Sequence, residues 1–449
     1  MKNTISCRQN AWYGDNEISY RFPDNWKITV FSPQDRAKLS DDEIYTKIQN
    51  PLGCFPLIKQ LKPGMKVLII SDDITRPTRT DVIIPILLNI LKNAGIHSTH
   101  VSILIGTGLH SLMGDHEKML KFGKAIVDNF KIYDHDYRGK NIYAGKTRQG
   151  TPVFINRHVM ESDFIIGVGG IYPHNPAGFG GGAKLILGVS GEKTIKYFHL
   201  RRKGVDAGGA VSNEFRQDLL EASRLAGMNF IINNLVDKNR NIIDIFAGDV
   251  DSAYHAGVEK AMDIFGVPSP ADQSFDLVVA DAYPFDSTFA FTRKGWWPIR
   301  QCGRKSYKLI ISSIPNGIGN HPLFPTVPVR YPKIIDAYNQ YLTSGIKDFI
   351  FNYSVKSIYR GGRNFASEGF HKVKNMIRPS AKEAPAARNQ PLPATLLHGL
   401  DKNFSNQPLP YSLRSTNNLK EFTDHLISQT GDRELKVGFY QASSLTFPG

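Results

Sequence analysis

Short apolar runs alternate with longer amphipathic stretches along the chain, and this pattern constrains the fold more than any other feature. VLIISDD (Val67–Asp73) and HVSILIGTG (His100–Gly108) have the length and the Val/Ile content of buried strands. Between them, DVIIPILLNILKNAG (Asp81–Gly95) has a helical pattern that ends at a glycine. Further strand candidates are FKIYDHD (Phe130–Asp136), DFIIGVGG (Asp163–Gly170) and FIINNLVD (Phe230–Asp237). Buried strands separated by helices predict a parallel or mixed sheet with helices on its faces.

A change in composition near residue 270 divides the chain. GVPSPADQS (Gly266–Ser274) has two prolines and no apolar periodicity, which is typical of a linker. Strand candidates resume at Asp276–Pro284, Lys308–Gly319 and Lys436–Ala442. We therefore predict a two-domain α/β protein with Rossmann-like sheets and helices on both faces, with domains at 1–268 and 275–449. Pro379–Pro410 is rich in proline and polar residues and is expected to be a long irregular excursion.

The totals exclude several classes of protein. No apolar run reaches the roughly 18 residues of a membrane span, and the N-terminus lacks the apolar stretch of a secretory signal. Three widely spaced cysteines fit a reducing cytoplasm. The net charge is +14, and the stretch 356–388 holds eight Lys/Arg against two Glu. Without a nucleic-acid motif beside it, this excess favours a solvated basic face or an anion-attracting cleft over nucleic-acid binding.

Ligands of open α/β sheets bind at the carboxyl ends of the strands, so the loops that follow the strands are the candidate sites. SDDITRPTRT (Ser71–Thr80) follows the first strong strand. Asp72 or Asp73 could accept hydrogen bonds from hydroxyls, and Arg76 or Arg79 could bind a carboxylate or phosphate with two hydrogen bonds. The alternative is an N-cap and turn before the next helix.

Two histidines follow later strands. His110 stands in GTGLHSLMGDHE, which lacks the third glycine of a dinucleotide fingerprint because Ser111 occupies that place. His135 lies between two aspartates in YDHDY and indicates either a metal site or a simple turn, of which we favour the turn.

The segment GVGGIYPHNPAGFGGGAKLILGVSG (Gly167–Gly191) is the richest in candidate residues. It holds His174, a glycine run that includes Gly181 and Gly182, and Lys184. The Walker pattern fails because alanine precedes the lysine and leucine follows it. Glycines let a flat group approach the backbone, and a lysine in an apolar site tends to lose its proton and become a nucleophile or covalent anchor. The alternative is a lysine that extends its amine to solvent.

A further histidine, His199, follows on a predicted helix in KTIKYFHLRRKG. Imidazole is a usual ligand of nickel, copper and zinc, although a core or surface histidine is the alternative. The motifs occur in the order D-x-T-R-P, GTGLH, an H-D pair, VGG, PH, AGF-x-GGAK and then this histidine. In this order they resemble the lactate racemase family of nickel-pincer enzymes, from the region of Tyr13 to that of Ala280.

The resemblance implies a nickel-pincer nucleotide, a pyridinium mononucleotide with two sulfur arms and a ring carbon on nickel, in the cleft between two domains. It implies that Lys184 tethers the cofactor, that His199 binds nickel, and that His110 and His174 act as acid and base. Asp73 matches the turn aspartate of the family, although the adjacent Asp72 could fill that place. Three further groups are expected to bind cofactor or substrate: Arg76, Lys294 and the glycines Gly181 and Gly182.

These roles imply an isomerase that inverts C2 of a 2-hydroxy acid by reversible hydride transfer, with cofactor-biosynthesis proteins as partners. Two alternatives stay open. One is a pincer-dependent oxidoreductase that releases the 2-keto acid, and the other is a relative without cofactor that binds an anionic metabolite or nucleic acid.

Three residues depart from the family pattern. Phe285 replaces the lysine of Y-P-K-D, Phe291 stands near the place of a glutamine, and Asn175 follows His174 where an aromatic residue is common. We therefore expect a substrate of a different shape from lactate. The turn RGGR (Arg360–Arg363) could add contacts to anions.

Overall fold

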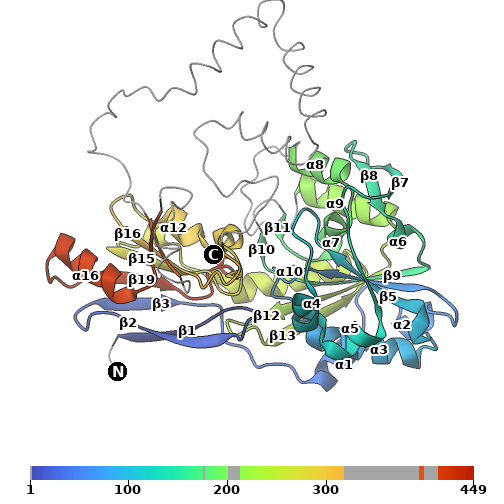
Figure 1. The fold of residues 1–449 in the computed structure, drawn as a ribbon, viewed down its shortest axis with the longest axis horizontal. Coiled ribbons are helices and arrows are strands. Elements are labelled where there is room, and N and C mark those ends of the chain that lie inside the picture. The colour runs from blue at the N-terminus through green and yellow to red at the C-terminus, as the bar shows by residue number, and fades with distance from the viewer. Residues whose placement is uncertain (1–2, 175–176, 201–212, 318–393, 399–412) are drawn as a thin grey trace, which may run out of the picture.

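The computed structural model describes residues 3–174, 177–200, 213–317, 394–398 and 413–449 (Figure 1). Within these residues the chain forms two six-stranded sheets, which lie to the right and to the left in Figure 1. Most strands are parallel and helices cover the sheets, which confirms the predicted α/β class. In the described part of the chain, no helix is long and apolar enough to cross a membrane.

The first sheet has the order β13-β12-β9-β4-β5-β6. Its strands are β4 (Val67–Asp72), β5 (Val101–Gly106), β6 (Lys131–Asp134), β9 (Phe164–Gly170), β12 (Phe230–Val236) and β13 (Ile242–Gly248). Five of them are parallel, and β13 runs antiparallel to β12. The carboxyl ends of β4, β5 and β9 therefore meet at one edge of the sheet.

Helices cover both faces of this sheet. Val67 and Ile69 of β4 pack into a core with one set of helices, whereas Leu68 and Ile70 pack into a core with another set. The first set includes α1 (Asp41–Gln49), α3 (Thr80–Asn93), α4 (Asp115–Phe122) and α5 (Lys124–Asn129). The second includes α7 (Leu185–Gly188), α8 (Glu192–Leu200), α9 (Glu214–Leu225) and α10 (Ser252–Phe265). Burial on both faces explains why β4 is an uninterrupted apolar run.

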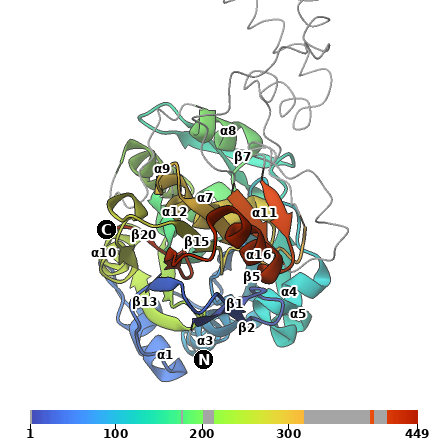
Figure 2. The same ribbon diagram turned by 90° about the vertical axis from the view of Figure 1, so that its left-hand side faces the viewer.

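The second sheet is entirely parallel, in the order β18-β17-β16-β15-β19-β3. Its strands are β3 (Lys27–Phe31), β15 (Leu277–Asp281), β16 (Tyr307–Ile311), β17 (Ala394–Leu397), β18 (Arg414–Thr416) and β19 (Lys436–Tyr440). The hairpin of β1 (Thr4–Gln9) and β2 (Asn16–Arg21) lies beside it, as seen in Figure 2. Strand β3 adds an N-terminal strand to a sheet that is otherwise built from residues 277–440. The domain boundaries at 1–268 and 275–449 stay a prediction.

The remaining elements connect the two sheets or cover them. The helices are α2 (Leu57–Gln60), α6 (Arg157–Met160), α11 (Phe289–Thr292), α12 (Trp297–Gln301) and α16 (Leu419–Thr430), with short turns of 3-10 helix at η1 (Ser98–His100), η2 (Gly182–Lys184), η3 (Pro270–Asp272) and η4 (Arg293–Gly295). The small strand pairs are β7 (Asn141–Lys146) with β8 (Pro152–Asn156), β10 (Pro173–His174) with β11 (Gly178–Phe179), and β14 (Gly266–Val267) with β20 (Phe447–Pro448).

Two expectations from the sequence require correction. Ala394–Leu397 lies inside the stretch that we expected to be irregular, yet it forms strand β17 between β16 and β18. The expected linker begins with strand β14, which pairs with β20. Both segments are too short to show a periodic pattern, so their neighbours in the sheet determine their conformation. The basic segment 356–388 and the RGGR turn lie outside the described residues, as does Asn175.

Candidate functional site

A cavity of about 530 Å³ lies where loops from the two sheets meet. The family resemblance gives a role to nine residues, and eight of them line the cavity: Asp73, Arg76, His110, His174, Gly181, Lys184, His199 and Lys294. Gly182 lies behind the wall, where its N–H donates to Oδ1 of Asn233 at 3.0 Å. Residues spread over more than 200 positions of the sequence thus converge on one space.

Asp73 and His110 form the first polar pair of the cavity, at the ends of β4 and β5. Nδ1 of His110 lies 2.5 Å from Oδ2 of Asp73, and Thr75 donates to the other carboxylate oxygen. Although burial raises the pKa of Asp73, the hydrogen bond from His110 and the charge of Arg76 hold it well below its usual range. Burial lowers the pKa of His110 against the opposing effect of Asp73. The ring therefore donates Nδ1–H to a carboxylate and keeps its lone pair on Nε2.

The structure distinguishes between the two aspartates of the turn. Asp72 binds the ammonium of Lys121 at 2.8 Å and accepts from the hydroxyl of Thr78. Lys121 is fully buried, and its Nζ also donates to the carbonyls of Arg76 and Thr78. Asp72 thus holds the turn together, whereas Asp73 orients a histidine of the cavity.

The two arginines of the turn also differ. Arg79 pairs with Asp81 at 2.8 Å and is absent from the cavity wall that the described residues form. Arg76 lines the cavity, and its Nη1 is buried without a hydrogen-bond partner among the described residues. The ring of Phe291 lies under the Arg76 guanidinium at 5.3 Å and meets His110 edge-on at 4.9 Å. Phe291 therefore forms an apolar wall between a cation and an imidazole.

Lys184 lies on η2, at the end of the glycine run. Burial, together with Arg76 and Arg216, lowers the pKa of Lys184 to about 7. At Gly181, φ is +76°, and a Cβ would lie 2.8 Å from Oδ1 of Asn233. Glycine is needed there because no larger residue would let the chain turn so close to β12. The amine is thus presented in a form that is partly neutral at physiological pH.

His174 and Lys294 face the cavity from the β10 strand and from η4. Nδ1 of His174 is buried without a hydrogen-bond partner among the described residues. Burial, with Lys294 and Lys184 nearby, lowers the pKa of His174 well below its usual range. Burial, with Arg76 and Lys184, also lowers the pKa of Lys294 well below its usual range. The ammonium of Lys294 lies 5.2 Å from the ring of Phe285.

His199 comes from the last turn of α8. Its Nδ1 lies 2.7 Å from the carbonyl of Ile195, so Nδ1 carries the proton. The lone pair of the ring is then on Nε2, in the tautomer that binds metals. His135, in contrast, is buried between the carbonyl of Ser190 and the amide of Asn156 and supports a turn. No group of three potential metal-ligating side chains occurs among the described residues.

Sequence reasoning missed several residues of the site. Lys121 lies among charged residues of a helix, and Asp72 is 49 positions away, so no local signal marks the pair. Arg216 donates to the carbonyl of Gly181 at 2.8 Å. Arg293 and Arg300 add to the cavity wall, which holds five Lys/Arg and two Asp among the described residues. This excess of positive charge suits ligands that carry carboxylate or phosphate groups.

The fold and the cavity define a class of protein. It is an α/β protein whose cavity, at the carboxyl ends of parallel strands, combines three histidines, a lysine of lowered pKa and an excess of cations. Residues 13–208 match the family model of the lactate racemase N-terminal domain. This match places the likeness to the lactate racemase family in less than half of the chain's length.

Two curated relatives are lactate racemases. The protein from Lactiplantibacillus plantarum is 32% identical over 266 residues, which are 58% of this chain and 62% of that protein. The protein from Thermoanaerobacterium thermosaccharolyticum is 29% identical over 298 residues, 63% of this chain and 68% of that protein. The match to the first relative thus spans less than two thirds of its length.

Solved structures show the same fold. The lactate racemase apoprotein from Thermoanaerobacterium thermosaccharolyticum superposes with a TM-score of 0.67 at 21% identity, over 99% of this chain and all of that one. A protein from Thermotoga maritima superposes with a TM-score of 0.57 at 16% identity, over 93% of this chain and all of that one.

Proposed function

We propose that this protein is a racemase or epimerase that inverts C2 of a 2-hydroxy acid with a nickel-pincer nucleotide tethered to Lys184. The observation that carries the proposal is the convergence of His110, His174, His199 and a partly neutral Lys184 on one cationic cavity. The two curated relatives named lactate racemase support the reaction class.

The residues of the cavity fit such a cofactor. A neutral lysine amine is the form that can bond covalently to an acyl group, and His199 would bind nickel through Nε2. Two buried nitrogens without partners among the described residues, Nη1 of Arg76 and Nδ1 of His174, belong to residues that line this cavity. Arg76 and the backbone near Gly181 would hold the nucleotide phosphate or the ring. The bound group would supply reversible acceptance of a hydride from C2, which avoids removal of a weakly acidic proton.

The histidines would move the hydroxyl proton of the substrate. Asp73 holds Nδ1–H of His110, so Nε2 of this ring can accept a proton. Burial keeps His174 neutral, and it can serve the opposite enantiomer. One residue on each side of C2 would let the same cavity act on both configurations.

Arg76 and Lys294 would bind the substrate carboxylate. Arg76 is a cation that lines the cavity, and one of its nitrogens has no partner among the described residues. Burial lowers the pKa of Lys294, so its amine would take up a proton when a carboxylate binds beside it. An uncompensated buried cation gains energy from an anion that fills its hydrogen-bonding positions. The carboxylate would thereby fix the orientation of C2 relative to the two histidines.

We further propose that the substrate is not lactate. Phe291 forms an apolar wall between Arg76 and His110, and Phe285 is fully buried beside Tyr172. Two aromatic side chains in place of a lysine and a glutamine remove polar partners and change the shape of the substrate pocket. We expect the protein to act in the cytoplasm, supplied by cofactor-biosynthesis proteins.

The first experiment is intact-protein mass spectrometry with peptide mapping and nickel analysis, on protein made in a host that synthesises the cofactor. We expect an adduct on Lys184 and nickel in the wild-type protein and in the control Lys193→Ala, whose lysine is exposed. Lys184→Ala should carry no adduct. An adduct that persists in this variant would remove Lys184 as the anchor.

A chiral screen of 2-hydroxy acids, aldonates included, follows on the loaded protein. Both enantiomers or epimers should appear from either one. Net release of the keto acid would favour the oxidoreductase alternative. Wild-type protein without adduct, under conditions that load a known lactate racemase, would contradict the proposal and favour an anion-binding relative.

A further inference from the structure

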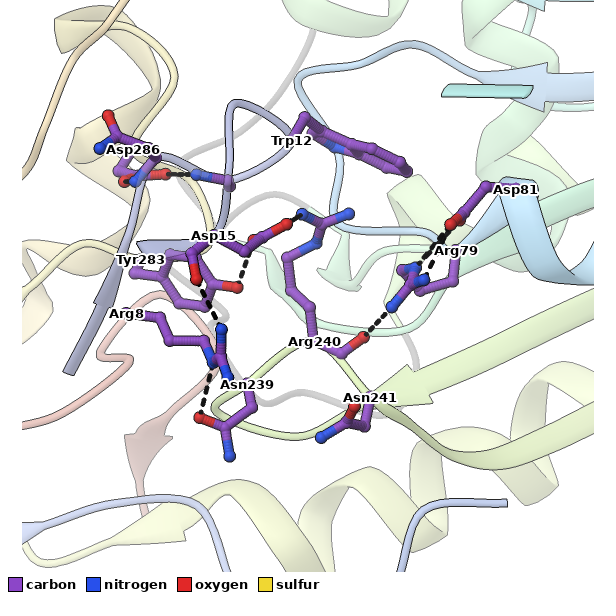
Figure 3. A network of polar contacts seen from close by, with 12 residues as sticks. Arg8, Trp12, Asp15, Arg79, Asp81, Asn239, Arg240, Asn241, Tyr283 and Asp286 are labelled. Atoms are coloured by element: carbon purple, nitrogen blue, oxygen red, sulfur yellow. Dashed lines mark hydrogen bonds and ion pairs between the residues drawn. The ribbon is translucent and has the colours of Figure 1, made fainter. Parts of the chain in front are cut away.

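The loop of residues 10–15, between β1 and β2, is anchored to the second sheet (Figure 3). The carboxylate of Asp286 accepts hydrogen bonds from the backbone N–H groups of Asn10 at 2.7 Å and Ala11 at 3.2 Å. The hydroxyl of Tyr283 donates to Asp15 at 2.6 Å. Both partners follow β15, so these hydrogen bonds fix the loop to the second sheet.

The same loop is held by the first sheet through Arg240, which lies between β12 and β13. Arg240 is 2% exposed and donates to both carboxylate oxygens of Asp15, at 2.7 and 2.6 Å. Its guanidinium lies 3.9 Å from the ring centroid of Trp12. The ammonium of Lys121 lies 4.7 Å from the same ring. The indole is therefore held by two buried cations, an attraction that is stronger when both partners are desolvated.

Trp12 in turn contacts the turn that carries the cavity residues. Its Nε1–H donates to the carbonyl of Arg76 at 3.0 Å, and Nζ of Lys121 donates to the same carbonyl at 3.3 Å. A carbonyl with two donors from separate elements cannot rotate without breaking one of them. The peptide plane after Arg76 is thereby fixed, and with it the direction in which the Arg76 side chain leaves the backbone.

We propose that Trp12 is a positioning residue, which couples the seating of the loop 10–15 to the geometry of Arg76 and Asp73 in the cavity. The effect on turnover rests on the role of Arg76 in the proposed function, whereas the positioning itself does not. The chain of contacts runs from the second sheet through Asp15 and Arg240 to Trp12 and the turn. The cavity geometry therefore depends on how the two sheets are held together.

A role in packing alone is the competing explanation, because Trp12 is 7% exposed. Trp26 provides a matched control, since it is 3% exposed and packs in a different core, beside Phe22. Trp12→Phe keeps an aromatic ring between the two cations and removes only the N–H donor and part of the surface. Trp26→Phe makes the same change in side-chain volume away from the turn.

The test is hydrogen–deuterium exchange of the apoprotein, followed by kinetics of the loaded enzyme. We expect Trp12→Phe to speed amide exchange of Thr75 and Arg76 by about threefold or more, while Trp26→Phe leaves these amides unchanged. In the loaded enzyme, Trp12→Phe should raise KM several-fold with a smaller fall in kcat. The reason is that the change displaces Arg76, which would bind the substrate both in the ground state and in the transition state.

Equal exchange of these amides in the two variants would overturn the positioning role. Faster exchange limited to Trp12→Phe, without any change in KM, would support positioning and instead remove Arg76 from the substrate site of the proposed function. Circular dichroism and thermal unfolding of both variants establish that each is folded before the comparison.

Discussion

At the scale of single residues, the cavity is built from groups whose charge state is shifted by burial. Lys184 is buried near Arg76 and Arg216, so a proton on its amine meets both desolvation and repulsion. His174 is kept neutral by the same causes. The protein thus keeps a nucleophile and a base in reactive forms near neutral pH, at a cost to the stability of the apoprotein.

This cost predicts a pH dependence for Lys184→Met in the apoprotein. The native pKa of Lys184 is about 7, lowered from 10.5, so between these pH values the unfolded chain binds more protons than the native state. Wild-type stability therefore rises with pH in that window, and the penalty is complete below pH 7. We expect the variant to be more stable by about 1–3 kcal/mol at pH 6, with a smaller gain at pH 9.

Urea unfolding at pH 6, 7.5 and 9 measures the difference. Lys193→Met, at an exposed position, should show no comparable trend with pH. A gain that grows toward pH 9 would contradict the lowered pKa.

The two histidines of the cavity make a second prediction at this scale. His110→Ala and His174→Ala should each lower turnover of a 2-hydroxy acid by about 100-fold or more, the usual contribution of a general acid or base. His97→Ala, at an exposed position just before η1, serves as the control. Normal turnover in either cavity variant would exclude that histidine from the acid–base pair.

At the scale of elements, the site depends on close approach of loops that follow parallel strands. The loop after β5, which carries His110, lies against α7: the N–H of Gly108 donates to the carbonyl of Gly188 at 2.8 Å. A Cβ on Gly188 would lie 2.5 Å from the carbonyl oxygen of Gly106. The glycine lets the lysine-bearing segment and the histidine-bearing loop share one wall of the cavity.

We therefore predict that Gly188→Ala displaces one of these two elements and costs about 1–3 kcal/mol, as overpacking usually does. Gly266→Ala is the control, because a Cβ there would make only ordinary contacts. Denaturant unfolding measures the free-energy cost for both variants. Equal stability of the two would show that the loop after β5 and α7 can separate enough to accept the extra methyl group at no cost.

At the scale of the whole molecule, polar contacts through the N-terminal loop connect the two sheets. Tyr283, after β15, donates to Asp15 of the N-terminal loop, and Asp15 also pairs with Arg240 of the first sheet. The first and last parts of the chain therefore join through β3 in the second sheet and through this loop. Separation of the sheets would expose a buried arginine and its carboxylate.

Tyr283→Phe removes one hydrogen bond of this connection and keeps the ring. We expect a loss of about 1.5–3 kcal/mol in the free energy of unfolding, the usual contribution of a hydrogen bond to a charged group. The exposed Tyr143→Phe provides the control. Equal unfolding curves for both variants would mean that the Arg240–Asp15 pair and the hydrogen bonds to Asp286 hold the loop without Tyr283.

The sequence by itself determined the class of the fold and many of the charged residues and histidines that line the cavity. Buried parallel strands are apolar throughout, and the loops that follow them carry the polar groups. Strands and candidate loops could therefore both be predicted from segments such as Val67–Asp73 and Gly167–Gly191. The family motifs added the order of those loops. Six of the eight selected residues that line the cavity follow β4, β5 or β9, because the carboxyl ends of neighbouring parallel strands meet at one edge of a sheet. His199 and Lys294 come from α8 and η4.

Only the tertiary structure decided the rest. It paired Asp73 with His110 and Asp72 with Lys121 through hydrogen bonds. It placed β3 and β17 in the second sheet and brought Trp12 within hydrogen-bond distance of the carbonyl of Arg76. Each of these depends on a partner far away in sequence, and local patterns carry no information about such partners. Pairing, burial and the resulting pKa shifts arise from which groups the folded chain brings together.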